Sequence, residues 1–596
     1  MTELCRREPD PDVYRAAIDS GYSELQARII ANRLSELPPG QFQEHIAPSL
    51  QQLDAPYLLP DIAPAAARIS KAIIDGEHLI LVSDHDADGA TGHAVAKAAL
   101  LEVMGVEPER VHSYLSHRLR EGYGVSDALC ERMLEQLQDV PRPALMVTID
   151  QGSADQARIA RLKEEGIETV VTDHHAIPEE GVPAAAVACV NPVSPGTEFP
   201  DKQIAGCHVI WLVMCAVRKV LIEAGRLLPD ARKMAPYLDW VATGTAADCV
   251  GLAMSRNNRA VMRYGLWLMN TRPRPCWSAI REVARMKDGP ISATDVAFMI
   301  APRINASGRV DDARLSLDLL MEDDHSEALG LATRLEAANT ERKTIQRELT
   351  TAGLELAAEQ DKEQVSGIVV FFENGHTGVH GVTASRLVEA YGRPVVCFSP
   401  KQGSAELISG SFRSVPGVHI RNALVRANEL APGAIKFFGG HEGAAGATIE
   451  AFELPRFTDA FRTAVSEQRC GTTMKPVVNT DGPLDQPWGP EQLRELDELE
   501  PFGREFEPPV FDGYFTIENL KAIGDGTHIT FDGVNKPGNR FKFIWFNAKV
   551  NAEDPFPAAN GDLARVAYTI KANTFRGNTS AQNVVRYLHV HQGAAA

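Results

Sequence analysis

Glu168-Thr-Val-Val-Thr172 runs directly into Asp173-His174-His175, and this stretch decides the fold. Its β-branched, apolar residues predict a short buried strand that ends at the aspartate. Two upstream segments have the same form, since Leu79–Ser83 leads into Asp84-His-Asp-Ala-Asp-Gly89 and Leu145–Ile149 leads into Asp150. Downstream, Gly244-Thr-Ala-Ala-Asp248 is interpreted as a fourth element of this series. Strands that alternate with helices and end in acids predict an α/β fold with a mainly parallel sheet.

The acids and histidines of these elements predict a metal centre. The carboxyl ends of parallel strands meet at one edge of a sheet, so the side chains that follow them can converge on a single crevice. Oxygen ligands with one or two imidazoles suit a pair of hard or borderline ions such as Mn²⁺ or Mg²⁺, and zinc held by thiolates does not fit this set. Four such elements in one chain are stronger evidence than any one of them.

Each element also has a more ordinary interpretation. The segment 84–89 resembles the opening of a calcium loop, but the twelfth position of that loop holds Val95 instead of glutamate, and a predicted strand precedes it. Asp150 and Asp248 would each fit as the N-cap of a helix that follows a strand. One ring of the His174-His175 pair would fit a core position and the other the surface. The chain would lack a metal site only if all of these ordinary interpretations were correct at the same time. The metal site is therefore the better interpretation.

Length and composition set broad limits. A chain of 596 residues exceeds what one hydrophobic core normally organises, so we expect roughly two to four domains. The net charge of −19 lowers, without excluding, the prospect of a polyanionic substrate, because phosphate binding depends on where cations cluster. Nine scattered cysteines without CxxC pairs are typical of a reducing cytoplasm. The N-terminus lacks a signal-peptide pattern, and no apolar stretch is long enough to cross a bilayer, so we expect a cytoplasmic protein.

Changes in the sequence pattern divide the chain into five parts. The third part is one long proline-free helix with a mostly apolar stripe, and the fifth has five short alternating runs separated by Gly, Asn and Asp turns, which predicts a small β-barrel. The expected boundaries are an N-terminal helical appendage at 1–60, an α/β catalytic domain at 61–323, a connecting helix at 324–364, a smaller α/β domain at 365–470 and the barrel at 471–596.

Several motifs together resemble the DHH phosphoesterase superfamily and, within it, the RecJ single-stranded-DNA exonucleases. Besides the acidic elements, they are Arg118-Leu-Arg-Glu-Gly-Tyr-Gly124, Asn191-Pro192, Ala301-Pro-Arg-Ile-Asn-Ala-Ser-Gly-Arg309, Gly381-Val-Thr-Ala-Ser-Arg386, Gly410-Ser-Phe-Arg-Ser414 and Phe438-Gly-Gly-His441. The resemblance runs from about His78 to the C-terminus. It implies a DHH domain for the first α/β unit, a DHHA1 domain for the second, and an OB-fold for the barrel, where Asn573-x-Phe-Arg-Gly577 is similar to a family motif.

The resemblance also implies roles for individual residues at the metal centre. Two divalent ions, Mn²⁺ or Mg²⁺, are implied, with Asp150 between them as a bridging, catalytic carboxylate. Asp84 and Asp86 would hold one ion, while the ligands of the other would be Asp88, His174 and Asp248. His175 would face the scissile phosphate as a second catalytic group. The sequence departs from the family pattern at Val82, which implies a less tightly held first ion, and also at His208 and Gly375.

Substrate-binding residues follow from the same resemblance. In the family the DHHA1 region holds the terminal 5′-phosphate, which implies this role for Ser385, Arg386, Arg413 and His441. The residues implied to contact phosphates from the catalytic side are Arg118, Arg303 and Arg309. In the barrel, the candidates for binding a single strand are Phe575 and Arg576. Without the motifs, an ordinary surface or interdomain ion pair would be the better interpretation of any one arginine.

These observations predict a metal-dependent exonuclease that removes mononucleotides from the 5′ end of single-stranded DNA in recombination and repair. The chain has no GxxxxGK[ST] loop for a nucleotide donor, which favours hydrolysis over phosphoryl transfer. The expected partner is single-stranded DNA with a 5′ end, a helicase and a single-strand-binding protein are left open as further partners, and the protein is expected to be a monomer that binds no membrane. Two alternatives remain: a related hydrolase of short RNA or cyclic dinucleotides, and a non-catalytic DNA-binding scaffold of the same fold. The barrel argues against the first and the intact acids against the second.

Overall fold

The computed structural model describes residues 2–38, 41–118, 120–310, 312–401, 403–404, 406–469, 475–549, 552–575 and 578–591. The chain forms two compact units. The larger contains Ser49–Val250 and Ser255–Pro476, and the smaller contains Met1–Pro48, Gly251–Met254 and Val477–Ala596. Within the described part of the chain, no helix has both the length and the apolar character needed to span a membrane.

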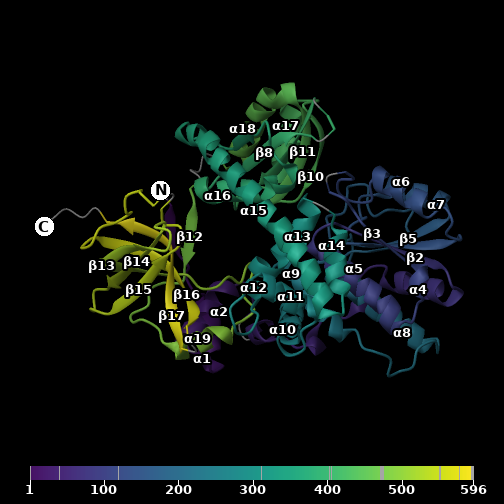
Figure 1. Cartoon of the computed structure of the whole chain (residues 1–596), viewed down its shortest axis with the longest axis horizontal. Coiled ribbons are helices and arrows are strands. Elements are labelled where there is room, and N and C mark those ends of the chain that lie inside the picture. Colours follow the sequence, from purple (N-terminus) through teal and green to yellow (C-terminus); the bar gives the residue numbers. More distant parts are fainter. Residues whose placement is uncertain are drawn as a thin grey trace. The chain divides into compact units, whose positions relative to one another are not determined.

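A parallel sheet forms the first part of the larger unit. Its strands are β2 (His78–Ser83), β3 (Val111–Leu115), β4 (Ala144–Ile149), β5 (Ile167–Thr172) and β6 (Ala188–Val190), in the order β3-β2-β4-β5-β6. One face is covered by α6 (Asp127–Gln136) and α7 (Gln156–Glu164), and the other by α4 (Ile62–Asp75), α5 (Ala87–Ala98) and α8 (Gly206–Glu223) (Figure 1). Because both faces are covered, the central strands β2 and β4 consist of nearly continuous apolar runs.

A helical segment follows β6, where the sequence predicted further alternation of strands and helices. It contains α9 (Leu238–Ala247), α10 (Arg256–Thr271), α11 (Pro275–Val283), α12 (Ala293–Asp295), α13 (Ala301–Val310) and α14 (Arg314–Met321). The interpretation of Gly244-Thr-Ala-Ala-Asp248 as a strand with an acid at its end is wrong, since Asp248 ends helix α9. Helix α9 packs against α5, α8 and α10, and most of its residues are buried. A helix buried on all sides shows no polar face, so its sequence pattern cannot be told from that of a buried strand.

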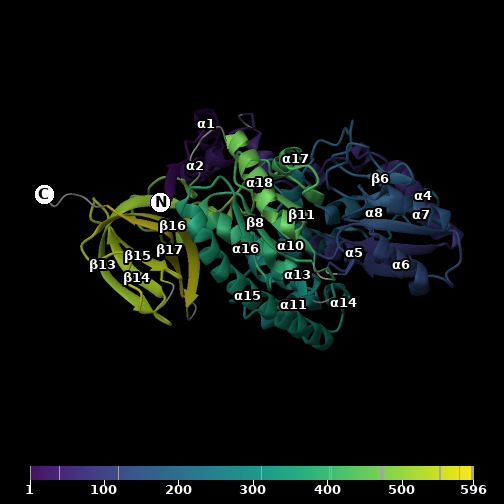
Figure 2. The same cartoon turned by 90° about the horizontal axis from the view of Figure 1, so that it is seen from above.

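Helix α15 (His325–Lys362) joins this segment to a second sheet, as predicted. It packs against α11, α13 and α14 and also against β7 (Ile368–Phe371) and α16 (Thr377–Tyr391) (Figures 1 and 2). The second sheet has the order β10-β11-β9-β8-β7. Its other strands are β8 (Val395–Pro400), β9 (Leu407–Arg413), β10 (Ile435–Gly440) and β11 (Ala444–Glu450), and α17 (Ile420–Leu430) and α18 (Leu454–Arg469) cover the face opposite α16.

The smaller unit is built on the predicted barrel. Five strands close it in the order β13-β14-β15-β17-β16: β13 (Phe511–Ile523), β14 (His528–Val534), β15 (Arg540–Trp545), β16 (Leu563–Phe575) and β17 (Asn578–Val590). Phe515, Phe541 and Phe543 fill its core.

The N-terminal region folds with the barrel in this unit. It contains β1 (Glu3–Arg6), α1 (Pro11–Asp19), α2 (Glu24–Arg33) and α3 (Phe42–Ile46), and β1 pairs in parallel with β12 (Val477–Thr480). Near the barrel, Gln26 of α2 donates a hydrogen bond to the Glu495 carbonyl of α19 (Pro490–Asp497). The sequence predicted only helices at this end of the chain, whereas the structure also contains the strand β1. The five domain boundaries stay predictions.

Candidate metal centre and nucleic-acid interface

The loop after β2 brings three aspartates to the carboxyl edge of the first sheet. Asp86 is the N-cap of α5, and its carboxylate accepts hydrogen bonds from the backbone N–H groups of Asp88 (2.9 Å) and Gly89 (3.1 Å). Such a cap satisfies amides that have no partner inside the helix. Asp84, directly after the strand, accepts a hydrogen bond of 3.0 Å from the Ser116 hydroxyl. The alternation of aspartates in this loop therefore places the three carboxylates in one small region.

Asp88 and Asp150 meet at the N-terminus of α8. The Asp88 carboxylate accepts hydrogen bonds from the backbone N–H groups of Gly206 (2.7 Å) and Cys207 (2.9 Å), the first two residues of that helix. Asp150 follows β4 with a φ of 61°, in the left-handed region that aspartate tolerates better than most residues. It is not the helix N-cap of the ordinary interpretation, because the next helix, α7, begins at Gln156 and has Asp155 as its N-cap. A Cβ on Gly206 would lie 2.6 Å from the Asp150 Cβ, so only glycine allows this approach.

Asp173 holds the histidine pair in place. Its carboxylate accepts hydrogen bonds from the backbone N–H groups of Ser153 (3.0 Å), His174 (2.8 Å) and His175 (3.1 Å). Its Oδ1 also lies 2.7 Å from Nδ1 of the His175 ring. Burial alone would lower the pKa of His175, but the Asp173 carboxylate raises it to about 10. The contact with Asp173 therefore favours the charged form of the His175 imidazole and fixes the orientation of its ring.

His174 lies at the centre of the acids. Its Nε2 is 3.1 Å from Asp150 Oδ1, 3.7 Å from Asp248 Oδ2 and 3.8 Å from Asp88 Oδ2. Residues from four places in the sequence thus converge, although Asp248 comes from the end of helix α9 and not from a strand.

Ligand atoms of the predicted metal residues fall into groups compact enough to hold an ion. In each group the atoms lie within 4.8 Å of one another: Asp84, Asp86 and Asp150; Asp88, His174 and Asp248; Asp150, His174 and His175. The first two groups contain the residues that the resemblance divides between two ions. Asp150 belongs to the first group and also contacts His174 of the second.

The electrostatics of the cluster fit divalent cations. Burial is the largest cause that raises the pKa of Asp150, Asp86 and Asp248, and repulsion from neighbouring carboxylates adds to it. The pKa of Asp248 rises to about 7. Buried carboxylates that repel one another are stabilised by positive charge placed between them, and oxygen-rich sites of this kind suit Mn²⁺ and Mg²⁺. The donor set therefore fits the ions that the sequence implied.

Three of the predicted arginines lie near one another. The Arg118 guanidinium is 5.2 Å from the centroid of the Tyr123 ring. Burial lowers the pKa of Arg309 and of Arg413, and the positive charge of Arg118 lowers both further. Arg309 of α13 also donates a hydrogen bond of 3.0 Å to the Gly378 carbonyl of α16. An anion placed between arginines that repel one another would relieve that repulsion.

His441 reaches the catalytic side from the second sheet. Its ring stacks on that of His175, with the centroids 5.6 Å apart and the planes at 23°. Ser385 of α16 donates its hydroxyl to the Gly381 carbonyl one turn earlier. A Cβ on Gly381 would lie 2.6 Å from Arg413 Nη2, so the glycine makes room for that guanidinium.

Two other predicted arginines are engaged elsewhere. Arg303 is buried and forms an ion pair of 2.5 Å with Glu336 of α15. Arg386 forms an ion pair of 2.8 Å with Glu389 of its own helix, and both side chains are exposed. These are the ordinary ion pairs that the sequence left open for a single arginine. Outside the described side chains lie the two predicted barrel contacts, Phe575 and Arg576.

Sequence reasoning missed two residues of the site. The sequence predicts no role for Asp173 beyond its place in the motif. In the structure its carboxylate accepts a hydrogen bond from the His174 backbone and contacts the His175 ring. Tyr123 is 65% exposed, and its ring centroid lies 5.2 Å from that of His85. The signal for Tyr123 is its place in the segment 118–124, where an aromatic residue follows two arginines.

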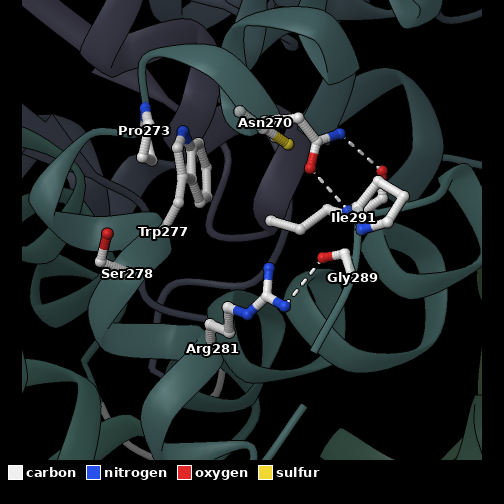
Figure 3. A pocket seen from close by; sticks show the side chains of 9 residues that line it. Asn270, Pro273, Trp277, Ser278, Arg281, Gly289 and Ile291 are labelled. Carbon is white, nitrogen blue, oxygen red and sulfur yellow. Dashed lines mark hydrogen bonds between the residues drawn. The ribbon is translucent and has the colours of Figure 1, made fainter. Parts of the chain in front are cut away.

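A cavity of about 330 Å³ lies between α10 and α11, lined by residues that include Asn270, Trp277 and Arg281 (Figure 3). Asn270 exchanges hydrogen bonds with the backbone of Ile291, and Arg281 donates to the Gly289 carbonyl. The polar groups of the cavity therefore hold the segment Gly289–Ile291 in place. None of the predicted site residues lines this cavity. The acid cluster, not this cavity, is the candidate active site.

Three family models match the chain. The N-terminal domain of the DHH family matches residues 78–245, the DHHA1 domain matches residues 364–467, and the RecJ OB domain matches residues 485–587. The single-stranded-DNA-specific exonuclease RecJ of Dickeya dadantii is 32% identical over 560 residues, which cover 92% of this chain and 93% of the relative. The RecJ of Haemophilus influenzae is 33% identical over 91% of this chain and 92% of the relative.

The chain belongs to the RecJ family. The crystal structure of RecJ from Thermus thermophilus in complex with Mn²⁺ superposes with a TM-score of 0.77 at 26% identity, covering 99% of this chain and 80% of that one. A structure of exonuclease RecJ bound to manganese gives a TM-score of 0.54 at 31% identity, over 68% of this chain and 95% of that one. These matches confirm the predicted fold class: a DHH domain, a DHHA1 domain and an OB barrel.

Proposed function

We propose that this chain is a metal-dependent exonuclease that hydrolyses single-stranded DNA from its 5′ end to nucleoside 5′-monophosphates, in DNA recombination and repair. One observation carries the proposal: in a member of the RecJ family, six predicted ligands from distant parts of the chain fall into compact groups around Asp150 and His174. A scaffold protein would have no need to keep mutually repelling carboxylates buried, because they destabilise the fold unless cations bind.

The groups support a two-ion assignment with Mn²⁺ or Mg²⁺. Asp84 and Asp86 would hold one ion, the ligands of the other would be Asp88, His174 and Asp248, and Asp150 would serve both. Two divalent ions bound there would activate a water molecule and stabilise the leaving oxygen of a phosphodiester.

The chain's own residues orient the substrate. His175, held in orientation by Asp173, would donate a hydrogen bond or a proton to a phosphate or leaving-group oxygen. Arg118, Arg309 and Arg413 would bind phosphate oxygens, and Ser385, Arg386 and His441 would complete a site for the terminal 5′-phosphate. Arg303, Phe575 and Arg576 remain in the proposal as weaker candidates.

Single-stranded DNA with a 5′ end is the proposed partner, and the OB barrel is the proposed module that binds the strand. We include a cytoplasmic location, a monomeric state, and a helicase or a single-strand-binding protein as further partners. The free cysteines Cys130, Cys189, Cys207, Cys276 and Cys397 are buried as small core residues, which supports a reducing compartment.

The test follows hydrolysis of oligonucleotides labelled at either end, in Mn²⁺. We expect mononucleotides to be released from the 5′ end of single strands and little from duplexes. Asp150→Asn should lower hydrolysis by at least about 100-fold. Asp139→Asn, which changes an exposed aspartate after α6, is the matched control and should retain full activity.

Three outcomes would overturn the proposal. Cleavage confined to dinucleotides, trinucleotides or cyclic dinucleotides would favour the short-substrate hydrolase. Binding of single strands without any cleavage by the wild-type chain would favour a scaffold. Full activity of the Asp150→Asn variant would remove the two-ion site.

A further inference from the structure

Helix α13 lies against the loop 84–88, which carries three of the predicted metal ligands (the metal loop). A Cβ on Gly308 would come within 2.3 Å of the His85 carbonyl oxygen, so only glycine lets the helix backbone approach the loop this closely. One turn earlier on the same helix, Asn305 contacts the backbone of Ala87. Contacts at two successive turns therefore fix α13 beside the metal loop.

The side-chain amide of Asn305 is engaged at one end only. Its Oδ1 accepts a hydrogen bond of 2.7 Å from the backbone N–H of Ala87, the first residue of helix α5. The first amides of a helix have no partner inside the helix, so this bond supplies one. Within the described part of the chain, the Nδ2 of Asn305 has no hydrogen-bond partner, and the side chain is partly exposed. A neutral N–H donor is therefore held in a fixed orientation at the metal loop and is free to bind a ligand.

The same face of α13 carries one of the arginines proposed to bind phosphate. Arg309 follows Asn305 by four residues, which places both side chains on one face of the helix. Burial and the charge of Arg118 lower the pKa of Arg309, and the Asp86 carboxylate offsets part of this shift. The Arg309 guanidinium thus lies near both the metal loop and Arg118. Asn305 is therefore in contact with the metal loop and one helical turn from the arginines.

The terminal nucleotide of the substrate has to connect these two places. In the proposed function its 5′-phosphate binds at the arginines and His441, and the phosphate on its 3′ side is the scissile group at the metal centre. Asn305 lies at the metal end of this connection, because its Oδ1 is bonded to the metal loop itself. A hydrogen bond to a charged oxygen is stronger than one between neutral groups, and an amide donor does not add charge beside the cations.

We propose that Asn305 donates a hydrogen bond from Nδ2 to a nonbridging oxygen of the scissile phosphate, while its Oδ1 holds the metal loop. The inference rests on the proposed function and adds a substrate-binding residue to it. Because the same amide is bonded to the loop that carries the metal ligands, the donor and the ions keep a constant spacing when the phosphate binds. A purely structural Asn305 would need only Oδ1, so a variant that keeps the oxygen and loses the donor separates the two roles.

Asn305→Asp is that variant, since a carboxylate can accept the Ala87 N–H and donates nothing. We expect kcat/KM for 5′-phosphorylated single strands to fall by about 10- to 100-fold, the cost of one lost hydrogen bond to a charged group. Mn²⁺ binding without DNA, measured by titration calorimetry, should stay at least as tight as in the wild type. The matched control is Asn422→Asp, which changes an exposed asparagine of α17 and should keep full activity. Wild-type activity of Asn305→Asp, or a loss of activity that follows a loss of Mn²⁺ affinity, would overturn the proposal.

Methylphosphonate strands test the same contact without adding a charge to the protein. The two diastereomers of a methylphosphonate at the first linkage each replace one nonbridging oxygen by a methyl group, and their binding to wild type and Asn305→Ala in Mn²⁺ is measured by fluorescence anisotropy. The reference is the same strand with a phosphorothioate at that linkage. For one diastereomer the wild type should lose about 10- to 100-fold more affinity than Asn305→Ala, because the variant has no bond left to lose.

Equal losses in both proteins for both diastereomers would overturn the contact and leave the exonuclease proposal intact. Failure of the wild type to cleave unmodified single strands would instead overturn the proposed function.

Discussion

Two glycines, Gly206 and Gly244, provide the space that the carboxylates of the acid cluster need. A Cβ on Gly206 would lie 2.6 Å from the Asp150 Cβ, and a Cβ on Gly244 would lie 2.8 Å from Asp88 Oδ1. Both distances are shorter than real Cβ contacts, so any larger residue must displace the helix or the carboxylate. At the scale of the residue, the positions of the acids depend on the absence of side chains as much as on the acids themselves.

Gly206→Ala tests this dependence. We expect hydrolysis of single-stranded DNA to fall by about 100-fold, because a displacement of about 1 Å in a catalytic group can cost that much. Gly330→Ala in α15 is the matched control, since a Cβ there meets nothing within 4 Å. It should keep full activity and gain up to about 1 kcal/mol of stability from the better helix former. Equal activity of both variants in the labelled-strand assay would show that Asp150 tolerates the shift.

At the scale of the element, a buried ion pair joins helix α2 to the segment that follows strand β12 in the smaller unit. Arg33 of α2 donates from Nη1 to Asp481 Oδ1 at 2.6 Å and from Nη2 to Oδ2 at 3.0 Å, and both side chains are almost completely buried. Asp481 directly follows β12, so the pair connects the N-terminal helices to the segment that leads into the barrel. Removing the Asp481 charge leaves the buried Arg33 guanidinium with only the Glu507 carboxylate at 3.8 Å and the Glu507 carbonyl as partners, which is costly for a buried charge.

Asp481→Asn should therefore lower the free energy of unfolding of the smaller unit by about 3–5 kcal/mol at pH 7. Burial alone would raise the pKa of Asp481, but the hydrogen bond and charge of Arg33 lower it below its ordinary value. The carboxylate thus stabilises the fold above its unfolded pKa of about 3.9, and this contribution is lost as the pH falls through the lower folded pKa.

Denaturant unfolding at neutral and acidic pH measures this difference. The gap between wild type and Asp481→Asn should shrink as the pH falls below about 4. Glu553→Gln, which changes an exposed carboxylate of the same unit, should leave the unfolding curve unchanged at both pH values. A gap of constant size would mean that the charge of Asp481 does not contribute.

For the whole molecule, the buried acids make the stability of the larger unit depend on bound cations. The chain has a net charge of −19, and its cluster gathers carboxylates that directly follow β2, β4 and α9, together with Asp88 of α5. A ligand that binds only the folded state stabilises it by mass action. The larger unit should therefore respond to divalent ions even when no DNA is present.

Calorimetric unfolding of the full chain measures this response. Mn²⁺ at about 100 times its dissociation constant should stabilise the larger unit by about 2.7 kcal/mol, and EDTA should reverse the change. Asp150→Asn should lose most of the stabilisation, whereas Asp139→Asn should keep it. An identical rise in Tm for wild type and Asp150→Asn would place the ions elsewhere.

Local patterns made most of the fold predictable. The runs 79–83, 145–149 and 168–172 are short, apolar and followed by acids, and each is a strand in the structure. The proline-free stretch after residue 323 is one helix, and the five alternating runs are the five barrel strands. Helix α9 escaped prediction because burial on every side removes the polar face by which a helix is recognised.

By itself, the amino-acid sequence determined the residue types and spacing of the proposed site: the DHH triplet, the aspartate loop and the arginine motifs, since side-chain type and spacing are local properties. Only the tertiary structure decided what surrounds them. Asp173 became the residue that holds both histidines, Arg303 and Arg386 were taken up by Glu336 and Glu389, and Met1–Pro48 joined the barrel unit. Contacts between residues hundreds of positions apart depend on how the elements pack, and no local pattern in the sequence encodes that packing.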